Sequence, residues 1–493
     1  MSLAQPVASL LAPSKVSEAR VSGLILALVV VGLYSVCVFS MAVLADGDTW
    51  SHLVTGDWIL SHRAIPRADP FSLWMPPRAW TAHEWLSEIL LALAFRAGGW
   101  SGVVILTGAV AGAAVLIMGL RVARDLEGAA LGVVVTVGVG LWAPNLLARP
   151  HVLTLPLTAL WVVALLKARD DARAPPLALS ALMIPWSNMH GGFVFGLALI
   201  VPFAFEAAIE APRGQRIAAA RAWAAFAGAA ALAALVNPYG FQALAFPFQL
   251  MSLEHLSRIS EWKPENFGRP SPLEFGLIAL LAFALSRPMA VPRIRVALLA
   301  ALLAMALAHA RHGQLLGLIA PMLLAPSIAR AIGASRPDDW RVVARTAIGA
   351  SGALALAMGL IRLATPLQRV DSAVAPISAL AAVPESLREK PVLNDYSFGG
   401  YLIWAHVRPF IDGRADMYGD PMLGLYLKLS AGDPRTVEET LARNHIAWTI
   451  FAPDTKIIAT LDREPGWRRI YADSHAIVHM REDAGEAPIL RGD

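Results

Sequence analysis

The sequence predicts a polytopic α-helical membrane protein that carries a small C-terminal α/β domain outside the cytoplasm. Of its 493 residues, 56% are hydrophobic and only 16% are charged, whereas soluble domains carry roughly 25% charged residues. Apolar runs recur from residue 21 to residue 362, and many have the length of about 20 residues that a spanning helix needs. The hydrophobicity then falls, so the chain divides into a membrane part and a water-soluble part.

We expect about eleven transmembrane helices. Three of the candidate runs, 177–187, 273–285 and 296–309, are short for a full span. The eleven ranges are 21–45, 101–120, 129–146, 152–166, 177–187, 192–210, 222–236, 273–285, 296–309, 313–329 and 346–362. The first run is longer than the apolar region of a cleaved signal peptide, about 7–15 residues, so we interpret it as a span. A further run at 241–253 is too short to cross and is predicted to lie at the membrane interface.

The basic residues predict the orientation. The proposed cytoplasmic segments hold 17 Lys and Arg, and the longer outer segments hold 9, which is the positive-inside bias. This assigns the N-terminus to the cytoplasm and the C-terminal domain to the periplasm of a bacterial inner membrane, since the Ala- and Arg-rich composition suggests a bacterium. The same loop charges explain the pI near 9.3, so nucleic acid is not expected as a partner.

The domain boundary is predicted near residue 364. Residues 1–364 form the membrane domain, which includes a long first outer loop at 46–99, and residues 365–493 form the α/β domain. Within the α/β domain, 391–393, 409–411 and 447–451 are predicted as short buried strands, and 436–443 as a helix. Cys37 is the only cysteine, which excludes an internal disulfide or a thiolate metal site.

Polar residues gather on the predicted outer side. Polar side chains at membrane depth are costly and therefore are functional candidates. The residues on this face are Asp46, Asp48, His83, Glu84, Arg149, His151, Asn188, His190, Asn237, Tyr239, Glu261, Arg311 and His312. Their convergence predicts a polar site at the outer membrane surface.

Asp46, Gly47 and Asp48 form the sharpest motif, directly after the first predicted span. In an extended loop, residues two apart point the same way. Asp46 and Asp48 would then share a divalent cation such as Mg²⁺ or Mn²⁺, or one would be a catalytic base that the other orients. The alternative is that both acids only mark a helix end in water.

The other polar residues suggest acid–base chemistry and anion binding. His83 and Glu84 are candidates for an acid–base or metal-ligand pair, although an acid at a helix N-terminus is also favoured for structural reasons. Arg149, His151, Arg311 and His312 offer positive charge to a phosphate, or to lipid headgroups. Asn188 and His190 allow hydrogen bonds between helices as the structural alternative.

The chain combines a first span that ends in Asp-Gly-Asp, a long first outer loop, many further spans and a C-terminal α/β domain. This combination resembles the GT-C glycosyltransferases, a superfamily that includes oligosaccharyltransferases, protein O-mannosyltransferases and the aminoarabinose transferases of lipid A. The resemblance is closer to a bacterial branch with little assigned function and covers most of the chain. Its motifs here are DGDTWSHLVTGDWILSHRAIPRADPFS (46–72), HEWL (83–86), WSNMHGG (186–192), NPYG (237–240), EW (261–262), RH (311–312), NDYSFGGYLIW (394–404) and FIDGRADMYGD (410–420).

The resemblance implies an inverting transfer of a sugar from a polyprenyl phosphate or pyrophosphate carrier to an unidentified extracytoplasmic acceptor, with no nucleotide cofactor. Asp46 or Asp48 would take the acceptor proton or hold the cation. Arg149, His151, Arg311 and His312 would stabilise the leaving phosphate. Asp395 and Tyr396 are loosely similar to the acceptor-recognition motif of oligosaccharyltransferases. Asp412, Arg414 and Asp416 give the C-terminal domain further groups for binding, or alternatively a structural ion pair.

Two other interpretations remain open. A transporter, flippase or envelope-glycan assembly partner would bind a glycolipid without chemistry, and the break near 188–192 suits a transporter. Against it, the acids lie on one side rather than at the midplane, and no inverted repeat is visible. A binding module on a membrane anchor would not need eleven spans.

Overall fold

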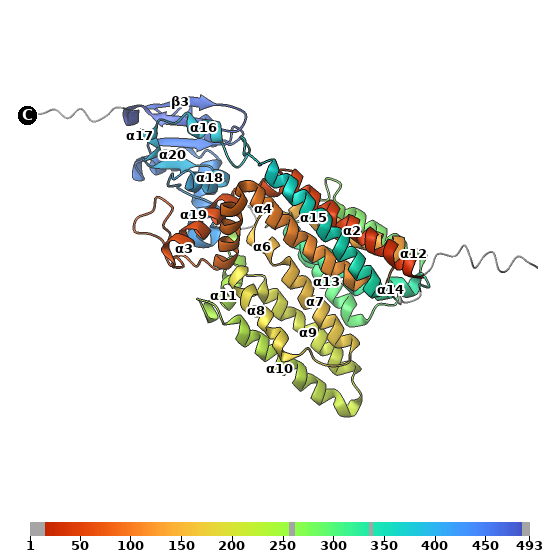
Figure 1. The fold of residues 1–493 in the computed structure, drawn as a ribbon. Coiled ribbons are helices and arrows are strands. Elements are labelled where there is room, and N and C mark those ends of the chain that lie inside the picture. The colour runs from red at the N-terminus through yellow and green to blue at the C-terminus, as the bar shows by residue number, and fades with distance from the viewer. Residues whose placement is uncertain (1–14, 256–261, 335–338, 486–493) are drawn as a thin grey trace, which may run out of the picture.

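The structure, a computed structural model, describes residues 15–255, 262–334 and 339–485. An elongated body of helices carries a small sheet domain at one end, and α3 and α19 lie where the two parts meet (Figure 1). The fold class predicted from the sequence is confirmed.

Each of the eleven predicted spans falls on helical structure. The helices are α2 (Lys15–Phe39), α4 (Trp85–Val122), α5 (Gly128–Trp142), α6 (Pro150–Leu153) with α7 (Leu155–Asp170), η3 (Leu177–Leu182) with α8 (Met183–Met189), α9 (Phe193–Glu210), α10 (Arg216–Ala234), α12 (Pro272–Ser286), α13 (Arg293–Ala308), α14 (Gly313–Ala331) and α15 (Trp340–Ala364). In the described residues, eight helical segments are long and apolar enough to cross a membrane. The other three coincide with the ranges that the sequence marked as short.

Two boundaries differ from the prediction. The first span ends at Phe39 and is followed by a single turn, η1 (Ala42–Leu44). The first outer loop is not an extended loop, because it contains α3 (Asp48–His62) and the first turns of α4. Helix α4 bends at Gly99, where φ is +57°, a conformation that suits glycine. The predicted interfacial run forms α11 (Phe241–Met251).

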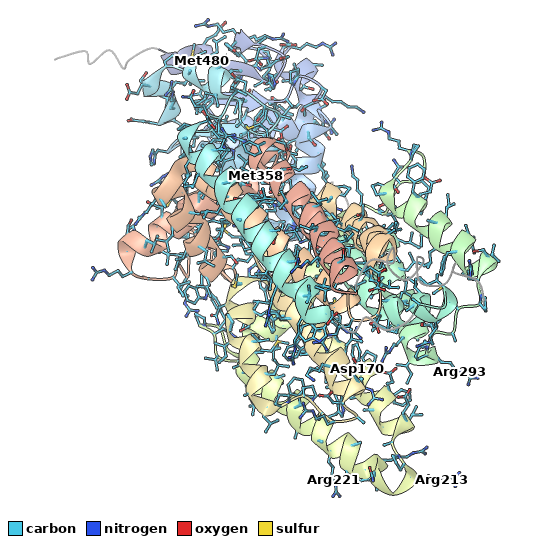
Figure 2. All side chains as sticks on the ribbon, turned by 45° about the vertical axis from the view of Figure 1, so that its right-hand side comes forward. Asp170, Arg213, Arg221, Arg293, Met358 and Met480 are labelled. Carbon is cyan, nitrogen blue, oxygen red and sulfur yellow. The ribbon has the colours of Figure 1, made fainter. Side chains whose placement is uncertain are left out.

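The outer surface of the body is apolar. Large side chains such as Leu28, Leu281, Leu285 and Leu356 are more than half exposed, which suits contact with lipid rather than water. Figure 2 shows Arg213, Arg221 and Arg293 at the end of the body that is far from the sheet domain. The basic loops and the sheet domain therefore lie at opposite ends, as the charge distribution predicts.

The C-terminal domain is built on a mixed four-stranded sheet. Its strands are β1 (Val392–Asn394), β2 (Trp448–Phe451), β3 (Trp467–Ala472) and β4 (Ile477–Arg481). The strand order is β1-β2-β4-β3, with β1 parallel to β2 and the other pairs antiparallel. The helices are α16 (Ile377–Ala381), α17 (Glu385–Arg388), α18 (Gly399–Trp404), α19 (Ala415–Ser430), α20 (Pro434–Arg443) and α21 (Ile457–Leu461), with a 3₁₀ turn η8 (Tyr396–Phe398).

The predicted strands at 391–393 and 447–451 and the predicted helix at 436–443 are confirmed as β1, β2 and α20. The strand predicted at 409–411 is wrong. The amide of Asn394 replaces a neighbouring strand there: its Oδ1 accepts from the N–H of Phe410 at 2.8 Å, and its Nδ2 donates to the carbonyl of Ile411 at 2.8 Å. One buried side chain therefore provides the hydrogen-bond partners for the backbone of a segment whose sequence resembles a strand.

The two parts of the chain are in backbone contact. A Cβ added to Gly400, in α18, would lie 2.1 Å from the carbonyl oxygen of Gly47. The first outer loop also contacts the C-terminal domain, since Trp74 Nε1–H donates to the carbonyl of Phe410 at 2.9 Å. This docking brings the loop after β1 and the 412–416 segment next to the adjoining ends of the membrane helices.

Candidate functional site

A cavity of about 420 Å³ lies between the C-terminal domain and the ends of the membrane helices that are nearest to it. Its ionisable lining residues are Asp48, His52, His83, Glu84, Glu88, Arg149, His151, His190, Arg311, His312, Tyr396, Arg414 and Asp416. Its apolar lining includes Val194, Phe195, Phe246, Phe248, Leu250, Met251, Met305 and Leu315. A single space therefore combines charged groups with an apolar wall from α9, α11, α13 and α14.

Arg149 is paired with both acids of the Asp-Gly-Asp motif. Its Nε contacts Asp46, and its Nη2 contacts Asp48. The N–H of Ala148 donates to the carbonyl of Val43 at 2.7 Å, which holds Arg149 beside the end of the first span. Asp48 begins α3, so the extended conformation expected of this motif is wrong. The two carboxylates converge because both contact one guanidinium.

The expected shared cation does not fit this arrangement. A guanidinium lies where a cation bridging Asp46 and Asp48 would sit. Among residues 15–255, 262–334 and 339–485, no group of three or more His, Cys, Asp and Glu side chains is arranged to hold a metal ion. A Mg²⁺ or Ca²⁺ ion shared by Asp46 and Asp48 would also need further oxygen ligands.

Glu84 lies between two histidines at the start of α4. Its Oε1 is 3.7 Å from His83 Nε2 and 3.6 Å from His190 Nε2, and all three side chains line the cavity. Burial alone would raise the pKa of Glu84, but His83, His190, His52 and Arg149 together lower it. The predicted His83–Glu84 pair is thus brought together, with His190 as an additional neighbour, and Glu84 is ionised at neutral pH.

His52 and Glu88 were missed by the sequence reasoning. His52 Nδ1 lies 3.2 Å from Glu88 Oε1, and the two side chains are 13% and 4% exposed. The signal was present as helical spacing, because His52 follows Asp48 by four residues and Glu88 follows Glu84 by four. Residues four apart lie on one face of a helix, but the sequence predicts a loop over 46–99, where this spacing carries no meaning.

Cationic and imidazole side chains form a further part of the cavity lining. Arg149 and His151 flank the start of α6, and Arg311 and His312 belong to the 3₁₀ turn η7 (Ala310–His312). The turn is fixed by the N–H of Ala310, which donates to the carbonyl of Lys263 at 3.1 Å. The structure thus brings together all four residues that were predicted to bind a phosphate. The pKa of the neighbouring His190 is lowered to about 3, chiefly by burial, so His190 is neutral.

The C-terminal domain supplies the remaining wall. Tyr396, Gly413, Arg414, Ala415 and Asp416 line the cavity. A Cβ added to Gly413 would overlap the carboxylate of Asp48, so only glycine allows this close approach. Burial raises the pKa of Asp416, and its buried Oδ2 has no hydrogen-bond partner among the described residues.

Arg414 and Asp412 form a buried ion pair. Arg414 contacts Asp412 at 2.7 Å and Asp69 of the first outer loop at 2.7 Å, and Tyr418 donates to Asp412 at 2.7 Å. Burial raises the pKa of Tyr418. This network joins the two parts of the chain, so its contacts favour a structural role for Asp412, while Arg414 also faces the cavity.

Several predicted binding residues lie behind the cavity wall. Asn188 accepts from Trp85 Nε1 at 2.9 Å and donates to the carbonyl of Val236 at 2.8 Å. Asn237 accepts from the N–H of Tyr239, whose ring lies under the guanidinium of Arg67. Asp395 caps η8 through the N–H of Ser397 at 3.0 Å. A direct role of Asn188, Asn237, Tyr239 and Asp395 in binding stays a prediction, and Glu261 lies outside the described residues.

The fold is similar to that of solved membrane glycosyltransferases. The helical body with its C-terminal sheet domain matches an oligosaccharyltransferase and ArnT, which confirms the resemblance at the level of the fold alone. The chain aligns over 95% of its length with ArnT from Cupriavidus metallidurans bound to undecaprenyl phosphate, at 12% identity, a TM-score of 0.51 and 99% coverage of ArnT.

Two structures from Archaeoglobus fulgidus have the same fold. The oligosaccharyltransferase AglB, in complex with an inhibitory peptide and a dolichol-phosphate, matches 95% of this chain and 75% of its own, with 11% identity and a TM-score of 0.51. An apo form of the oligosaccharyltransferase matches 87% of this chain and 69% of its own, with 11% identity and a TM-score of 0.53. Comparison with protein-family models and with curated sequences gives no match.

Proposed function

We propose that this protein is a glycosyltransferase that moves a sugar from a polyprenyl phosphate or pyrophosphate carrier to an acceptor on the outer side of the membrane. The observation that carries the proposal is the composition of the cavity. Cationic groups, ionised carboxylates and an apolar wall surround one space at the junction of the membrane body and the C-terminal domain. Structures with the same fold hold dolichol-phosphate and undecaprenyl phosphate.

The donor is bound by two kinds of surface. Arg149, His151, Arg311 and His312 take the phosphate, because a guanidinium binds phosphate oxygens in a fixed fork geometry. A guanidinium carries five N–H donors, enough to serve two carboxylates and a phosphate oxygen at once. The polyprenyl chain follows the apolar wall that includes Phe246 and Phe248 of α11.

Asp48 is the proposed catalytic base. The base must reach both the acceptor hydroxyl and the sugar carbon beside the leaving phosphate. Asp48 meets this requirement best, because it contacts Arg149 on the phosphate side and Gly413 on the side of the C-terminal domain. The acceptor oxygen would bond to the sugar carbon as the bond to the phosphate breaks, Asp48 would take the acceptor proton, and Arg149 and Arg311 would stabilise the departing anion.

A single displacement of this kind inverts the configuration of the sugar carbon that is attacked. It needs one base and one stabilised leaving group, and it needs no covalent intermediate on the protein. Asp46 then positions Arg149, and Glu84 with His83 lies on the acceptor side near Asp416. The acceptor is a glycan, a lipid or a protein that enters between the membrane body and the C-terminal domain.

The proposal includes a topology. Residues 1–364 form the membrane domain of a bacterial inner-membrane protein, the N-terminus is cytoplasmic, and residues 365–493 form a periplasmic domain. The separation of the basic loops from the cavity end of the body supports this orientation. Accessibility of single cysteines introduced at Arg213 and at Glu439 to a membrane-impermeant reagent tests it, since only the second should react in intact cells.

The decisive experiment measures sugar transfer by the purified full chain in lipid nanodiscs. A panel of polyprenyl-phosphate sugars is offered with and without added Mg²⁺ or Mn²⁺, and wild type is compared with Asp48→Asn. Turnover by wild type that is lost in the variant, while undecaprenyl phosphate still binds, supports the transferase. Binding without turnover under every condition, unchanged by the substitution, would instead favour a glycolipid transporter or an assembly partner.

A further inference from the structure

His52 and Glu88 form a buried pair that the proposed transfer reaction does not use. Two helices each present two ionisable residues four apart: Asp48 and His52 on α3, and Glu84 and Glu88 at the start of α4. All four line the cavity. The four side chains thus belong to one wall of the site, where α3 meets the start of α4.

The geometry of the pair is fixed by backbone contact between the two helices. A Cβ added to Gly56 would lie 2.0 Å from the carbonyl oxygen of Glu88 and 2.8 Å from Cβ of Ala92. The glycine lets α3 approach α4 so closely that His52 Nδ1 lies 3.2 Å from Glu88 Oε1. Both side chains are largely buried, since they are only 13% and 4% exposed.

The surroundings of His52 are strongly acidic. The carboxylates that act on it are Asp48 from its own helix and Glu84 and Glu88 from the start of α4, while the charges of His83, His190 and Arg149 act on Glu84 as well. Burial would lower the pKa of His52, but the hydrogen bond to Glu88 and the three carboxylates raise it to about 9. An imidazolium here neutralises part of the negative charge of these carboxylates, which would otherwise repel one another.

We propose that His52 is a positively charged positioning residue, which is held by Glu88 and keeps the carboxylates of Asp48 and Glu84 together at the wall of the cavity. It does not touch the reacting atoms. Without its charge, three carboxylates in a poorly solvated space would repel one another, and Asp48 would shift from the position that lets it act as the base. This consequence for catalysis rests on the proposed function, whereas the charge of His52 does not.

The sign of the pH dependence follows from the raised pKa. The stability that the charged pair contributes is fully present below the ordinary pKa of histidine, about 6.5, and is lost as the pH rises through about 9. Transfer activity should have an alkaline limb near the same pH. A merely structural hydrogen bond from a neutral imidazole would give no such limb.

The first test needs no substrate. Histidine-labelled wild-type protein in nanodiscs is titrated by NMR, and the His52 signal is assigned by its absence in His52→Gln. We expect a midpoint near pH 9 that falls by about one unit or more in Glu88→Gln, because the hydrogen-bonded carboxylate is gone. A midpoint at or below the ordinary value of about 6.5 in wild type would overturn the proposal.

The second test uses transfer activity and matched variants. His52→Gln should lower kcat by about tenfold or more with little change in KM, and His52→Lys should restore part of the loss because it keeps the positive charge. The alkaline limb should disappear in His52→Lys. Equal activity of the Gln variant and wild type at every pH would overturn the proposal. If no donor supports transfer, the proposed function fails, and the NMR titration alone decides the charge of His52.

Discussion

The helical body carries buried charges at both ends, and the two sets differ in what surrounds them. At the end remote from the sheet domain, Glu206 of α9 is 1% exposed and contacts Arg169 of α7 at 3.3 Å and Arg295 of α13 at 3.0 Å. The three side chains satisfy one another, and they do not line the cavity. This cluster connects helices α7, α9 and α13 and therefore stabilises their packing.

At the other end, the charges face a cavity. Arg149 pairs with both Asp46 and Asp48, Glu84 lies between two histidines, and Asp416 has a buried oxygen without a hydrogen-bond partner among the described residues. Buried polar groups are normally satisfied. Buried charge alone therefore does not mark a site in this protein, whereas a charged cluster that lines a cavity does.

Asp48→Asn should have the largest effect on activity. Loss of the base should lower kcat by about a hundredfold to ten-thousandfold, while the melting temperature changes little because the Asn amide fits the same space. Sugar transfer and thermal unfolding measured on one nanodisc preparation check this. A variant that keeps near wild-type kcat would remove Asp48 from the chemistry and would leave Glu84, Glu88 and Asp416 as the remaining carboxylates of the cavity.

Glu206→Gln should show the opposite pattern. It leaves Arg169 and Arg295 without the buried carboxylate that they share, which costs on the order of 3 kcal/mol, so the melting temperature should fall clearly. The kcat of the protein that remains folded should stay close to wild type. A large fall in kcat without a loss of stability would contradict the structural role of Glu206. The distinction between a structural cluster at this end and a functional cluster at the cavity would then be lost.

Arg311→Gln should have an intermediate effect. Arg311 lines the cavity and stacks on Trp262 at 4.5 Å. A lost charge-assisted hydrogen bond to phosphate costs about 1.5–3 kcal/mol, so binding of undecaprenyl phosphate should weaken about tenfold to a hundredfold. Isothermal titration calorimetry with undecaprenyl phosphate measures this affinity. Arg213→Gln, at the remote end of the body, is the matched control. Unchanged binding would exclude Arg311 from the phosphate site.

The sequence predicted the parts of the molecule that depend on local patterns. Hydrophobic length located all the membrane helices, and β-branched and aromatic runs located β1 and β2, because these signals reside in consecutive residues. The grouping of Asp48, Glu84, Arg149 and Arg311 was also predicted, since loop charges assigned them to one side of the membrane. Their contacts were not predicted, because they depend on how distant segments pack.

Two predictions from local sequence motifs are wrong because distant residues determine the structure at both places. The Asp-Gly-Asp motif suggests a cation in sequence, but the hydrogen bond between Ala148 and Val43 brings Arg149 between its acids. Asn394 makes the 409–411 segment irregular from a position fifteen residues earlier or more. In both cases one side chain from a distant position takes the place of the cation or the neighbouring strand that the local motif suggests. No property of the motif itself predicts this side chain.

Asp57→Asn should have the smallest effect and therefore tests whether the comparison is specific. Asp57 lies on α3, as Asp48 does, but it is 57% exposed and pairs with Arg96 outside the cavity at 2.6 Å. An exposed ion pair contributes roughly 0–1 kcal/mol, so melting temperature, kcat and lipid binding should all stay near wild type. If removing this acid lowered kcat as strongly as Asp48→Asn, the loss would reflect damage to α3 as a whole. The assignment of Asp48 as the base would then lose its support, because any acid on the helix would do the same.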